Sequence, residues 1–514
     1  MPDVTDKIVS LAQLAETAAE ARQIGQRVVM CHGVFDVLHV GHLRYLEEAR
    51  AMGDMLIVTL TPDRFVNKGP HRPAFTETLR AEMLAGLTCV DQVAINNQPT
   101  AVEAIGLIQP DLYVKGPDYK DAAADLTGKI NDEADAVRSA GGEIAFTSGE
   151  TYSSSRLVNS HLSVLPDDTQ AWLKQFAAQH SFGDLRDWIE KAAGLKVLLV
   201  GETIIDEYVY CDAIGKSSKE PTLVLKRLSS EKFAGGILAA ANHVAQVCDE
   251  VGVLTLLGTE NSHEGFIERR LDPKVKRLFL HRRESPTIRK TRYVEEYHFA
   301  KLLETYDIND SILSQDEDDE ICGALMEQLP QYDLILTIDF GHFMLSPRAA
   351  EILRERSRFL AVNAQTNAGN LGYHTISKYR AGSGRGPDFM TATEGEARLE
   401  ARDPRGDIRG IVRNLYDDIR PQQLLVTRGA NGCLGYEGSG SFVGVPAVAA
   451  KVVDRVGAGD AFLSVAAPLA AAGAPLEVTS FIGNAAGALA VGTVGNREPV
   501  NRVSLLKYLE SILK

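Results

Sequence analysis

Apolar runs alternate with amphipathic stretches along most of this chain. The first run, RVVMCHGVF from Arg27, precedes the stretch LRYLEEARAMG, in which Leu43, Leu46 and Ala49 recur at helical spacing, and the run MLIVTL follows. Strands of a parallel sheet read as continuous apolar runs because both faces are covered, whereas covering helices show an apolar residue every three to four positions. We therefore predict a strand–helix–strand unit, continued by strands at QVAI and DLYVKG and by a helix near residues 130–140.

The same alternation returns later in the chain, so we predict two α/β domains. Residues 27–160 form a small parallel α/β domain behind an N-terminal helix in 1–26, and a helix-biased polar stretch over 161–194 forms a helical linker. From Leu195 the runs KVLLVGE, GVLTLLG, DLILTIDFG, FLAVNAQ, FMTATEGE and QLLVTRGANG predict a second, larger α/β domain over 195–514.

Charge and composition narrow the classes of ligand. The 514 residues carry 54 Lys and Arg against 69 Asp and Glu, a formal net charge of −15, so nucleic acid and anionic lipid are repelled and any phosphate must be held locally. The six cysteines form no CxxC pair, which disfavours a zinc site or a disulfide framework. The first 26 residues lack the basic start and apolar block typical of a signal peptide, and no apolar stretch reaches about 18 residues. We therefore expect a cytoplasmic protein without membrane or nucleic-acid partners.

The segment from Cys31 to His42 joins the first predicted strand to the first predicted helix. His39 and His42 are three residues apart, which places both imidazoles on one face of a helical turn, and Gly41 lies between them. Imidazole donors, free helix amides and the helix dipole would all face a polyphosphate here, at the carboxyl end of a strand, where α/β sheets bind ligands. The alternative is a pair of capping or partly exposed histidines with no ligand.

The string G-V-F-D-x-x-H-x-G-H resembles the signature of the cytidylyltransferase-like nucleotidyltransferase superfamily. The resemblance implies a Rossmann-like domain in which His39, His42 and Lys68 stabilise the charge of a nucleoside triphosphate. It also implies nucleotide-binding residues in the signature, in the run VKGPDY and in a serine run, namely Gly33, Phe35, Asp36, Gly41, Lys115, Gly116, Asp118, Ser153, Ser154 and Ser155. The alternative for the serine run is a helix N-cap alone. This half is similar to the adenylyltransferase half of bifunctional heptose-phosphate kinase/adenylyltransferases.

The reaction that this resemblance implies needs little covalent help from the protein. A sugar 1-phosphate oxygen would attack the α-phosphorus of ATP or CTP and expel pyrophosphate, so positioning and charge neutralisation carry the step. Mg²⁺ would bridge the triphosphate oxygens. Asp36 would orient the reactants rather than act as a base, because a phosphate nucleophile is already ionised near neutral pH.

A second candidate site lies in the segment DRVGAGDAF, residues 454–462, which precedes a helix-like run. Gly457, Ala458 and Gly459 make a tight loop whose amides can collect at the helix start and form an anion hole. Asp460 is suited to accept the proton of a substrate hydroxyl while the γ-phosphoryl group of ATP is transferred. The alternative is an ordinary glycine turn capped by an aspartate.

Together with the earlier segment FAGG and Asn242, this motif resembles the two signatures of PfkB/ribokinase-type sugar kinases. The resemblance implies a ribokinase-like α/β sandwich with a small β lid from residues 211–232, which in this family often mediates dimerisation, so we expect a homodimer or higher homo-oligomer. It places Asp206 at the end of the first strand of the domain. The implied sugar-binding residues are Asp206, Gly235, Gly236, Asn242 and Asp339, the implied nucleotide-binding residues are Thr427, Gly429, Gly432, Gly457, Ala458, Gly459 and Asn484, and Glu396 would contact Mg²⁺ indirectly.

Three departures from the family pattern concern this second site. Thr393 stands where an asparagine is usual in an N-x-x-E element, Glu202 replaces an aspartate after the first strand, and His342 replaces a lysine near the sugar phosphate. The last change implies a different acceptor or weakened activity. The base and the anion hole are retained, so we favour a working kinase.

Both halves together resemble bifunctional heptose-phosphate kinase/nucleotidyltransferases, but with the transferase first and the kinase second. The expected function is phosphorylation of a sugar or sugar phosphate, heptose 7-phosphate-like, at C1 by ATP, followed by nucleotidyl transfer to the sugar 1-phosphate, which gives an NDP-sugar. The alternative is a nucleotidyltransferase of the sugar 1-phosphate or glycerol 3-phosphate type, whose kinase-like domain only binds a ligand or serves as a scaffold.

Overall fold

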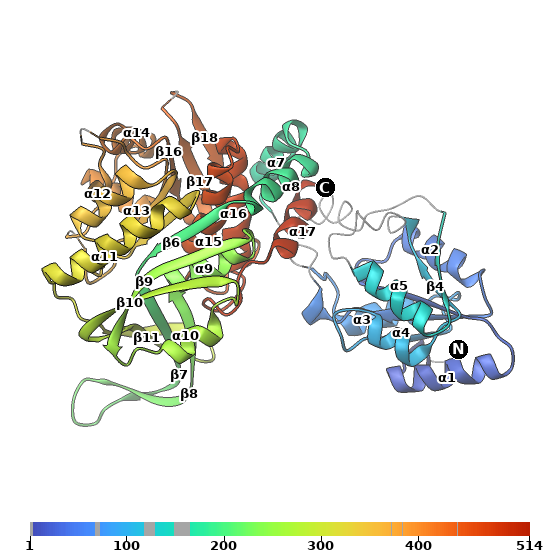
Figure 1. The fold of residues 1–514 in the computed structure, drawn as a ribbon. Helices are drawn as coiled ribbons and strands as arrows, with labels where there is room; N and C mark the ends of the chain where they lie inside the picture. Colours follow the sequence, from blue (N-terminus) through green and yellow to red (C-terminus); the bar gives the residue numbers. More distant parts are fainter. Residues whose placement is uncertain are drawn as a thin grey trace. The chain divides into compact units, whose positions relative to one another are not determined.

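The computed structural model shows two compact units, Met1–Pro166 with Leu506–Lys514, and Asp167–Leu505 (Figure 1). The structure describes residues 4–66, 72–117, 129–148, 165–371, 373–382, 384–438 and 440–514. Within these ranges no helix is both long and apolar enough to cross a bilayer.

The first unit is built on a five-stranded, all-parallel sheet with the strand order β3-β2-β1-β4-β5. The strands are β1 (Val28–Gly33), β2 (Met55–Leu60), β3 (Gln92–Ile95), β4 (Leu112–Lys115) and β5 (Glu143–Phe146). Because β1 pairs with β2 on one side and with β4 on the other, the strand order reverses at β1. The carboxyl ends of β1 and β4 therefore flank a switch point, where open parallel sheets bind ligands.

Helices cover both faces of this sheet, which explains its continuous apolar strands. Val28 and Met30 of β1 pack with Leu14 on one face, whereas Val29 packs with Leu46 on the other. The N-terminal helix α1 thus contributes to the core of this unit. The helices are α1 (Leu11–Gln23), α2 (Val40–Arg50), α3 (Glu77–Ala85), α4 (Val102–Ile108) and α5 (Lys129–Ser139).

The second unit contains a nine-stranded sheet in the order β10-β9-β6-β13-β14-β15-β16-β17-β18. Its strands are β6 (Lys196–Gly201), β9 (Glu250–Glu260), β10 (Val275–Pro286), β13 (Leu334–Asp339), β14 (Leu360–Ala364), β15 (Phe389–Thr393), β16 (Gln423–Thr427), β17 (Cys433–Tyr436) and β18 (Phe442–Val445). The sheet is parallel from β10 to β16 and ends in antiparallel pairs with β17 and β18. The α/β class predicted for both parts of the chain is confirmed.

Helices from the expected linker pack against this second unit. The rings of Trp172 and Phe176 in α7 contact Phe481 in α16, with centroids 5.5 and 4.4 Å apart. From residue 167 on, the helices are α7 (Asp167–Gln179), α8 (Phe182–Ala193), α9 (Ile237–Ala245), α10 (Glu264–Arg270), α11 (Gln315–Gln328), α12 (Pro347–Arg356), α13 (Glu394–Ala401), α14 (Ile408–Ile419), α15 (Ala458–Ala471), α16 (Leu476–Ala490) and α17 (Arg502–Leu513).

A separate four-stranded sheet has the order β12-β11-β7-β8. Its strands are β7 (Thr203–Lys216), β8 (Leu223–Gly236), β11 (Ile288–Glu295) and β12 (Ala300–Asp307). The first two contain the segment expected to form a lid, and Figure 1 shows their hairpin extending away from the rest of the unit. One expectation is wrong: Asp206 lies inside β7, opposite Phe233 of β8, and not at the end of the first strand of the unit, β6.

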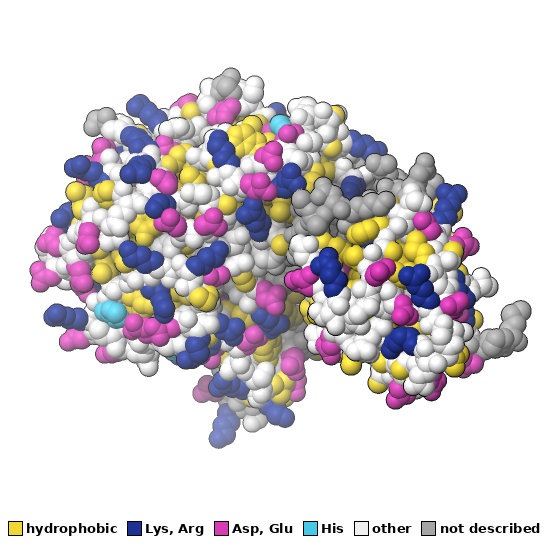
Figure 2. Space-filling view, turned by 45° about the vertical axis from the view of Figure 1, so that its right-hand side comes forward, with side chains coloured by type: hydrophobic (Ala, Val, Ile, Leu, Met, Phe, Trp, Pro, Cys, Tyr) yellow, Lys and Arg dark blue, Asp and Glu magenta, His cyan; other side chains and the backbone are white. Residues whose placement is uncertain are grey.

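The surface is of mixed charge. In the face shown in Figure 2, acidic and basic side chains are interspersed, without a continuous basic area. Such a surface agrees with the net charge of −15, and phosphate groups must be bound by local features of each unit.

Candidate active sites

The histidine pair of the first unit lies at the start of α2, after the turn that follows β1. His39 is the N-cap residue, and its Nδ1 accepts a hydrogen bond from the N–H of Gly41 (3.1 Å). The ring of His42 stacks on that of His39, with centroids 4.0 Å apart, and packs edge-on against Phe35 at 5.6 Å. Both imidazoles therefore lie at a helix N-terminus beside the switch point of the sheet, an arrangement suited to a polyphosphate.

The turn before these histidines has an unusual backbone. Phe35 and Val37 have positive φ angles of 49° and 53°, which non-glycine residues rarely adopt. Arg80 of α3, whose side chain is fully buried, supports the turn because its guanidinium donates to the carbonyl oxygens of Val34 and Thr61, the latter at 2.9 Å. Arg80 was not predicted as a site residue, since a lone arginine in an amphipathic helix carries no motif.

The carboxylate of Asp36 is hydrogen-bonded to residues that follow β2 in the sequence. Its carboxylate accepts hydrogen bonds from Nη1 of Arg72 (2.7 Å) and from the N–H of Ala74 (2.8 Å), and the side chains of Asp36 and Arg72 are almost completely buried. Asp36 thus fixes local backbone. Its expected effect on the reactants stays a prediction.

Lys115, expected on a nucleotide-edge loop, is the buried last residue of β4. Its Nζ lies 2.8 Å from Oε2 of Glu133, which also accepts a hydrogen bond from the hydroxyl of Tyr113 (2.9 Å). Burial opposes ionisation of Glu133, but Lys115 lowers the pKa of that carboxyl below its usual value. Nearby, burial lowers the pKa of His32 to about 3, so this histidine is neutral. Lys115 therefore belongs to a buried ion pair beside the switch point.

Several predicted residues of the first site lie outside the described part of the chain, and their roles stay predictions. They are Lys68, Asp118, Ser153, Ser154 and Ser155. Among the described ones, Gly33 ends β1, Gly41 lies in the first turn of α2 and Gly116 follows β4.

In the second unit, Asp460 lies in the first turn of α15, directly after the glycine loop. Its Oδ1 accepts a hydrogen bond from Nε2 of Gln365 (2.8 Å), which follows β14. Burial raises the pKa of Asp460 to about 7, against the hydrogen bond from Gln365, and the negative charge of Asp206 adds to the rise. A carboxyl with a pKa near neutral can accept a proton and release it again.

Asp206, on β7 of the small sheet, lies close enough to Asp460 for its negative charge to raise the pKa of that carboxyl. It forms a buried ion pair with Arg292 of β11. Gly235 of β8 has to lack a side chain, because a Cβ there would overlap the carboxylate of Asp206. The structure therefore brings together two residues predicted to bind sugar, Asp206 and Gly235, and the predicted base Asp460.

Two basic groups that the sequence analysis did not combine face the same cluster. Lys290 of β11 is buried, with its Nζ 5.0 Å from the ring centroid of Tyr306, and burial lowers its pKa against the attraction of Asp206. Burial is the main cause that lowers the pKa of His342 to about 3, and the positive charge of Lys290 adds to this effect. Nε2 of His342 is buried and has no hydrogen-bond partner in the part of the chain that the structure describes. The cluster thus contains a buried lysine and a neutral imidazole.

Two buried carboxyls support the strand ends beneath this cluster. Glu202 accepts hydrogen bonds from two backbone N–H groups that follow β13 (both 3.0 Å). Burial is the main cause that raises the pKa of Glu202 to about 7, and the negative charge of Asp339 adds to the rise. Asp339 accepts from Nζ of Lys378 (2.7 Å) and from the hydroxyl of Tyr379 (2.8 Å). Burial opposes ionisation of Asp339, but Lys378 lowers its pKa. Asp339 is 1% exposed, so its predicted contact with sugar would need this network to open.

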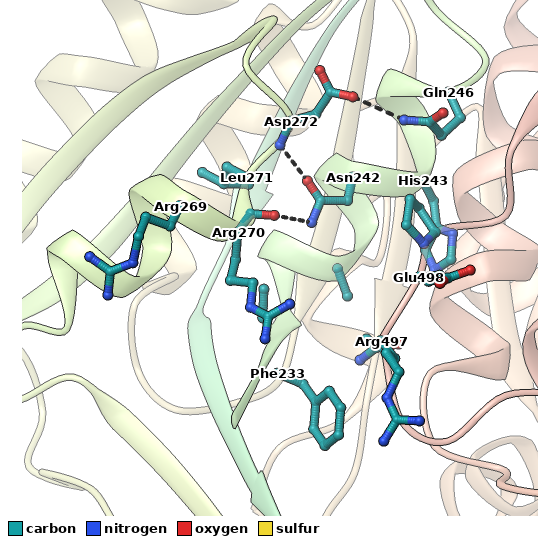
Figure 3. A pocket seen from close by; sticks show the side chains of 14 residues that line it. Phe233, Asn242, His243, Gln246, Arg269, Arg270, Leu271, Asp272, Arg497 and Glu498 are labelled. Carbon is teal, nitrogen blue, oxygen red and sulfur yellow. Dashed lines mark hydrogen bonds between the residues drawn. The ribbon is translucent and has the colours of Figure 1, made fainter. Parts of the chain in front are cut away.

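Asn242 lies elsewhere, in a cavity of about 210 Å³ between α9, α10 and residues 496–499 (Figure 3). Its Nδ2 donates to the carbonyl of Arg270 (2.9 Å), and its Oδ1 accepts from the N–H of Asp272 (2.8 Å). Both polar atoms of Asn242 therefore tie α9 to the end of α10. A contact with sugar hydroxyls stays a prediction that this geometry does not favour.

The departure at Thr393 has a structural explanation. Thr393 caps α13: its hydroxyl accepts from the N–H of Glu396, and Oε2 of Glu396 accepts from the N–H of Thr393 (2.8 Å), which is a capping box. Oε1 of Glu396 accepts from the N–H of Thr366 (3.0 Å). In the described ranges, no group of three or more His, Cys, Asp or Glu side chains could hold a metal ion. Glu396 is thus held in this helix cap, and its indirect contact with Mg²⁺ stays a prediction.

Four of the predicted nucleotide-binding residues of this unit, Thr427, Gly429, Gly432 and Asn484, lie around the turn from β16 to β17 and the end of β18. Thr427 ends β16, and Gly429 and Gly432 lie in the turn to β17. Asn484 of α16 donates from Nδ2 to the carbonyl of Pro446 (2.6 Å), at the end of β18. The turn borders a cavity of about 310 Å³, which is also lined by Trp172 of α7.

A nine-stranded sheet, a small sheet and a carboxyl after a glycine loop at a helix start together define an α/β phosphotransferase of the ribokinase-like class. Residues 195–502 match the family described as pfkB family carbohydrate kinase, and residues 30–160 match the family described as Cytidylyltransferase-like. The chain belongs to the pfkB family of carbohydrate kinases and carries a cytidylyltransferase-like domain before its kinase domain.

Individual relatives cover smaller parts. The bifunctional protein HldE of Citrifermentans bemidjiense is 39% identical over 166 residues, 31% of this chain and 32% of that protein. HldE of Geotalea uraniireducens is 44% identical over 120 residues, 23% of this chain and 24% of that protein. The chain thus spans about a third or less of the length of these curated relatives. A phosphofructokinase-2 mutant from Escherichia coli, at 15% identity, superposes with a TM-score of 0.50 over 62% of this chain and 100% of that chain, a likeness of fold alone.

Proposed function

We propose that this chain is a bifunctional sugar-activating enzyme. Its kinase unit transfers the γ-phosphoryl group of ATP to a sugar or sugar phosphate, heptose 7-phosphate-like, at C1. Its first unit transfers a nucleotidyl group from ATP or CTP to the resulting sugar 1-phosphate, which gives an NDP-sugar and pyrophosphate. The observation that carries the proposal is the buried Asp460, with a pKa of about 7, at the first turn of a helix that follows a glycine loop.

In the kinase step, Asp460 takes the proton of the acceptor hydroxyl as its oxygen bonds to the γ-phosphorus. The bond between that phosphorus and the β–γ bridging oxygen breaks, and ADP leaves. The amides at the start of α15 bind the transferred group. Mg²⁺, when bound with the nucleotide, would neutralise phosphate charge.

In the transfer step, an ionised phosphate oxygen of the sugar 1-phosphate bonds to the α-phosphorus, and pyrophosphate leaves without need of a base. His39 and His42 donate hydrogen bonds to the triphosphate, beside the N-terminus of α2 with its favourable helix dipole. Charge stabilisation of this type is the main contribution of proteins to phosphoryl transfer.

The test is mass spectrometry of the products that the whole chain forms from ATP or CTP and a panel of six- and seven-carbon sugar phosphates. We expect ATP to phosphorylate a sugar phosphate of the panel, and an NDP-sugar to form when the favoured nucleotidyl donor, ATP or CTP, is present. Binding of sugars without phosphorylation of any acceptor would reject the kinase half of the proposal.

A second candidate is a nucleotidyltransferase with a ligand-binding, inactive kinase domain. The observation in its favour is that the residues at Thr393, Glu202 and His342 depart from the family pattern and that Glu396 is engaged in a helix cap. This candidate predicts transfer activity from CTP or ATP to a supplied sugar 1-phosphate or glycerol 3-phosphate, with no ATP turnover by the kinase unit.

A further inference from the structure

Asp454, at the start of the loop DRVGAGDAF, is the meeting point of three segments of the kinase unit. Its side chain is 1% exposed. Oδ2 accepts hydrogen bonds from the hydroxyl of Tyr208 (2.7 Å) and from the N–H of Gly495 (3.0 Å). Oδ1 accepts from Nζ of Lys301 (2.6 Å) and from the N–H of Val456 (3.1 Å). Both oxygens are thus held by one side chain and one backbone donor each.

The two side-chain donors come from the small sheet. Tyr208 lies on β7, two residues from Asp206, and Lys301 lies on β12, with its Nζ 5.4 Å from the centroid of the Tyr208 ring. Tyr208 is completely buried. The sheet that carries the predicted acceptor-binding Asp206 is therefore linked directly to the residue that begins the glycine loop.

Of the two backbone donors, one lies in the glycine loop and the other in the segment beside it. Val456 directly precedes Gly457, whose φ of 82° requires a glycine. A Cβ at Gly457 would overlap Oδ1 of Asn496, the residue after Gly495. Asp454 therefore fixes the glycine turn through Val456 and the neighbouring segment through Gly495.

The charge of Asp454 depends on the same donors. Burial opposes its ionisation, but Lys301 and Tyr208 lower its pKa below the usual value, so it is a carboxylate at neutral pH. Removing one partner of a buried carboxylate leaves part of its charge unpaired, which favours rearrangement of the surrounding segments.

We propose that Lys301, Tyr208 and Asp454 form a positioning cluster that holds the glycine loop in its phosphate-binding shape as long as the small sheet lies over the acceptor. The proposal rests on the proposed kinase function. Asp454 touches neither the acceptor nor the reacting phosphorus and acts through the backbone of 456–459. The cluster couples the position of the sheet to the order of the loop, so that phosphoryl transfer to water is disfavoured.

The test compares Lys301→Met with Lys226→Met in the full chain. Lys226 is an exposed lysine on β8 of the same sheet and lies outside the cluster. We expect backbone amides of residues 456–460 to exchange hydrogen about tenfold faster in Lys301→Met and at the wild-type rate in the control. In turnover, kcat falls about tenfold while KM for ATP changes less than about threefold, and Lys301→Arg restores most of kcat.

Unchanged exchange at 456–460 in Lys301→Met, or faster exchange throughout the kinase unit, overturns the positioning role. Tyr208→Phe, which removes only the hydroxyl, supplies the same comparison if Lys301→Met fails to fold. A wild-type chain that phosphorylates no acceptor rejects the proposed function instead, and the exchange measurement then still decides whether the cluster orders the loop.

Discussion

The carboxyl of Asp460 is the group on which the kinase chemistry depends, and its pKa of about 7 sets a pH dependence. The protonated form cannot accept a proton from the acceptor. We therefore expect kcat for phosphoryl transfer to rise as pH increases from about 6 to 8 and then to reach a plateau. Glu202 also has a pKa of about 7, so Glu202→Gln serves as the control: the rise near pH 7 persists if Asp460 is responsible and disappears if Glu202 is.

The hydrogen bond from Gln365 to Asp460 gives a sharper prediction. A donated hydrogen bond stabilises the ionised carboxylate, so its loss in Gln365→Leu raises the pKa of Asp460. We expect the rise of kcat to move to higher pH, which lowers the rate at pH 7 more than the rate at pH 9. Gln331→Leu, a change at an exposed glutamine bonded only to its own helix region, is the matched control. A uniform loss of rate at all pH values would contradict this role.

Residues in motifs could be predicted from the sequence, and isolated residues could not. The pair His39 and His42 and the base Asp460 stand in dense local patterns, and the structure places each at a helix start. Gln365, just after β14, bonds to Asp460, and Lys290, within β11, acts on Asp460 through its charge. Single polar residues of this kind have no local signal in the sequence. Burial and pairing of single side chains depend on tertiary packing, which spacing along the chain does not report.

At the scale of elements, the loop before α15 contains two glycines whose backbone angles and surroundings differ. Gly457 has a φ of 82° and no room for a Cβ beside Asn496, whereas a Cβ at Gly459 would meet nothing within 4 Å. Gly457→Ala should therefore lower the free energy of unfolding by at least about 1–2 kcal/mol. Urea unfolding of both variants checks this, and an equal loss in Gly459→Ala would show that the left-handed backbone is not the cause.

Elements were predictable where a single physical rule determines them. Parallel strands buried on both faces, such as β2, stand out as apolar runs. Strands β11 and β12 were missed because β12 is exposed along nearly its whole length and both are rich in charged residues, so neither shows the apolar alternation of a half-buried strand. Strand β11 pairs with β7 and supplies Arg292, and β12 pairs with β11 and supplies Lys301, so the missed elements carry contacts of the candidate site.

At the scale of the whole molecule, each proposed reaction has its own α/β unit with its own core. Neither proposed site needs a basic surface, because in each proposal a helix N-terminus binds the phosphate groups. The acidic net charge of −15 is therefore compatible with nucleotide ligands.

Two separate sites predict that each activity can be removed alone. Asp460→Asn should lower phosphoryl transfer by about 10²–10⁴-fold, the usual contribution of a general base, and leave nucleotidyl transfer to a supplied sugar 1-phosphate unchanged. His42→Ala should lower nucleotidyl transfer by about 10²–10³-fold and leave phosphorylation unchanged, since it removes one charge-stabilising donor. Both activities are measured on the full chain by product mass spectrometry. If either substitution removed both activities from a folded protein, the two units would share one site or depend on each other, and independent catalysis would be the wrong description.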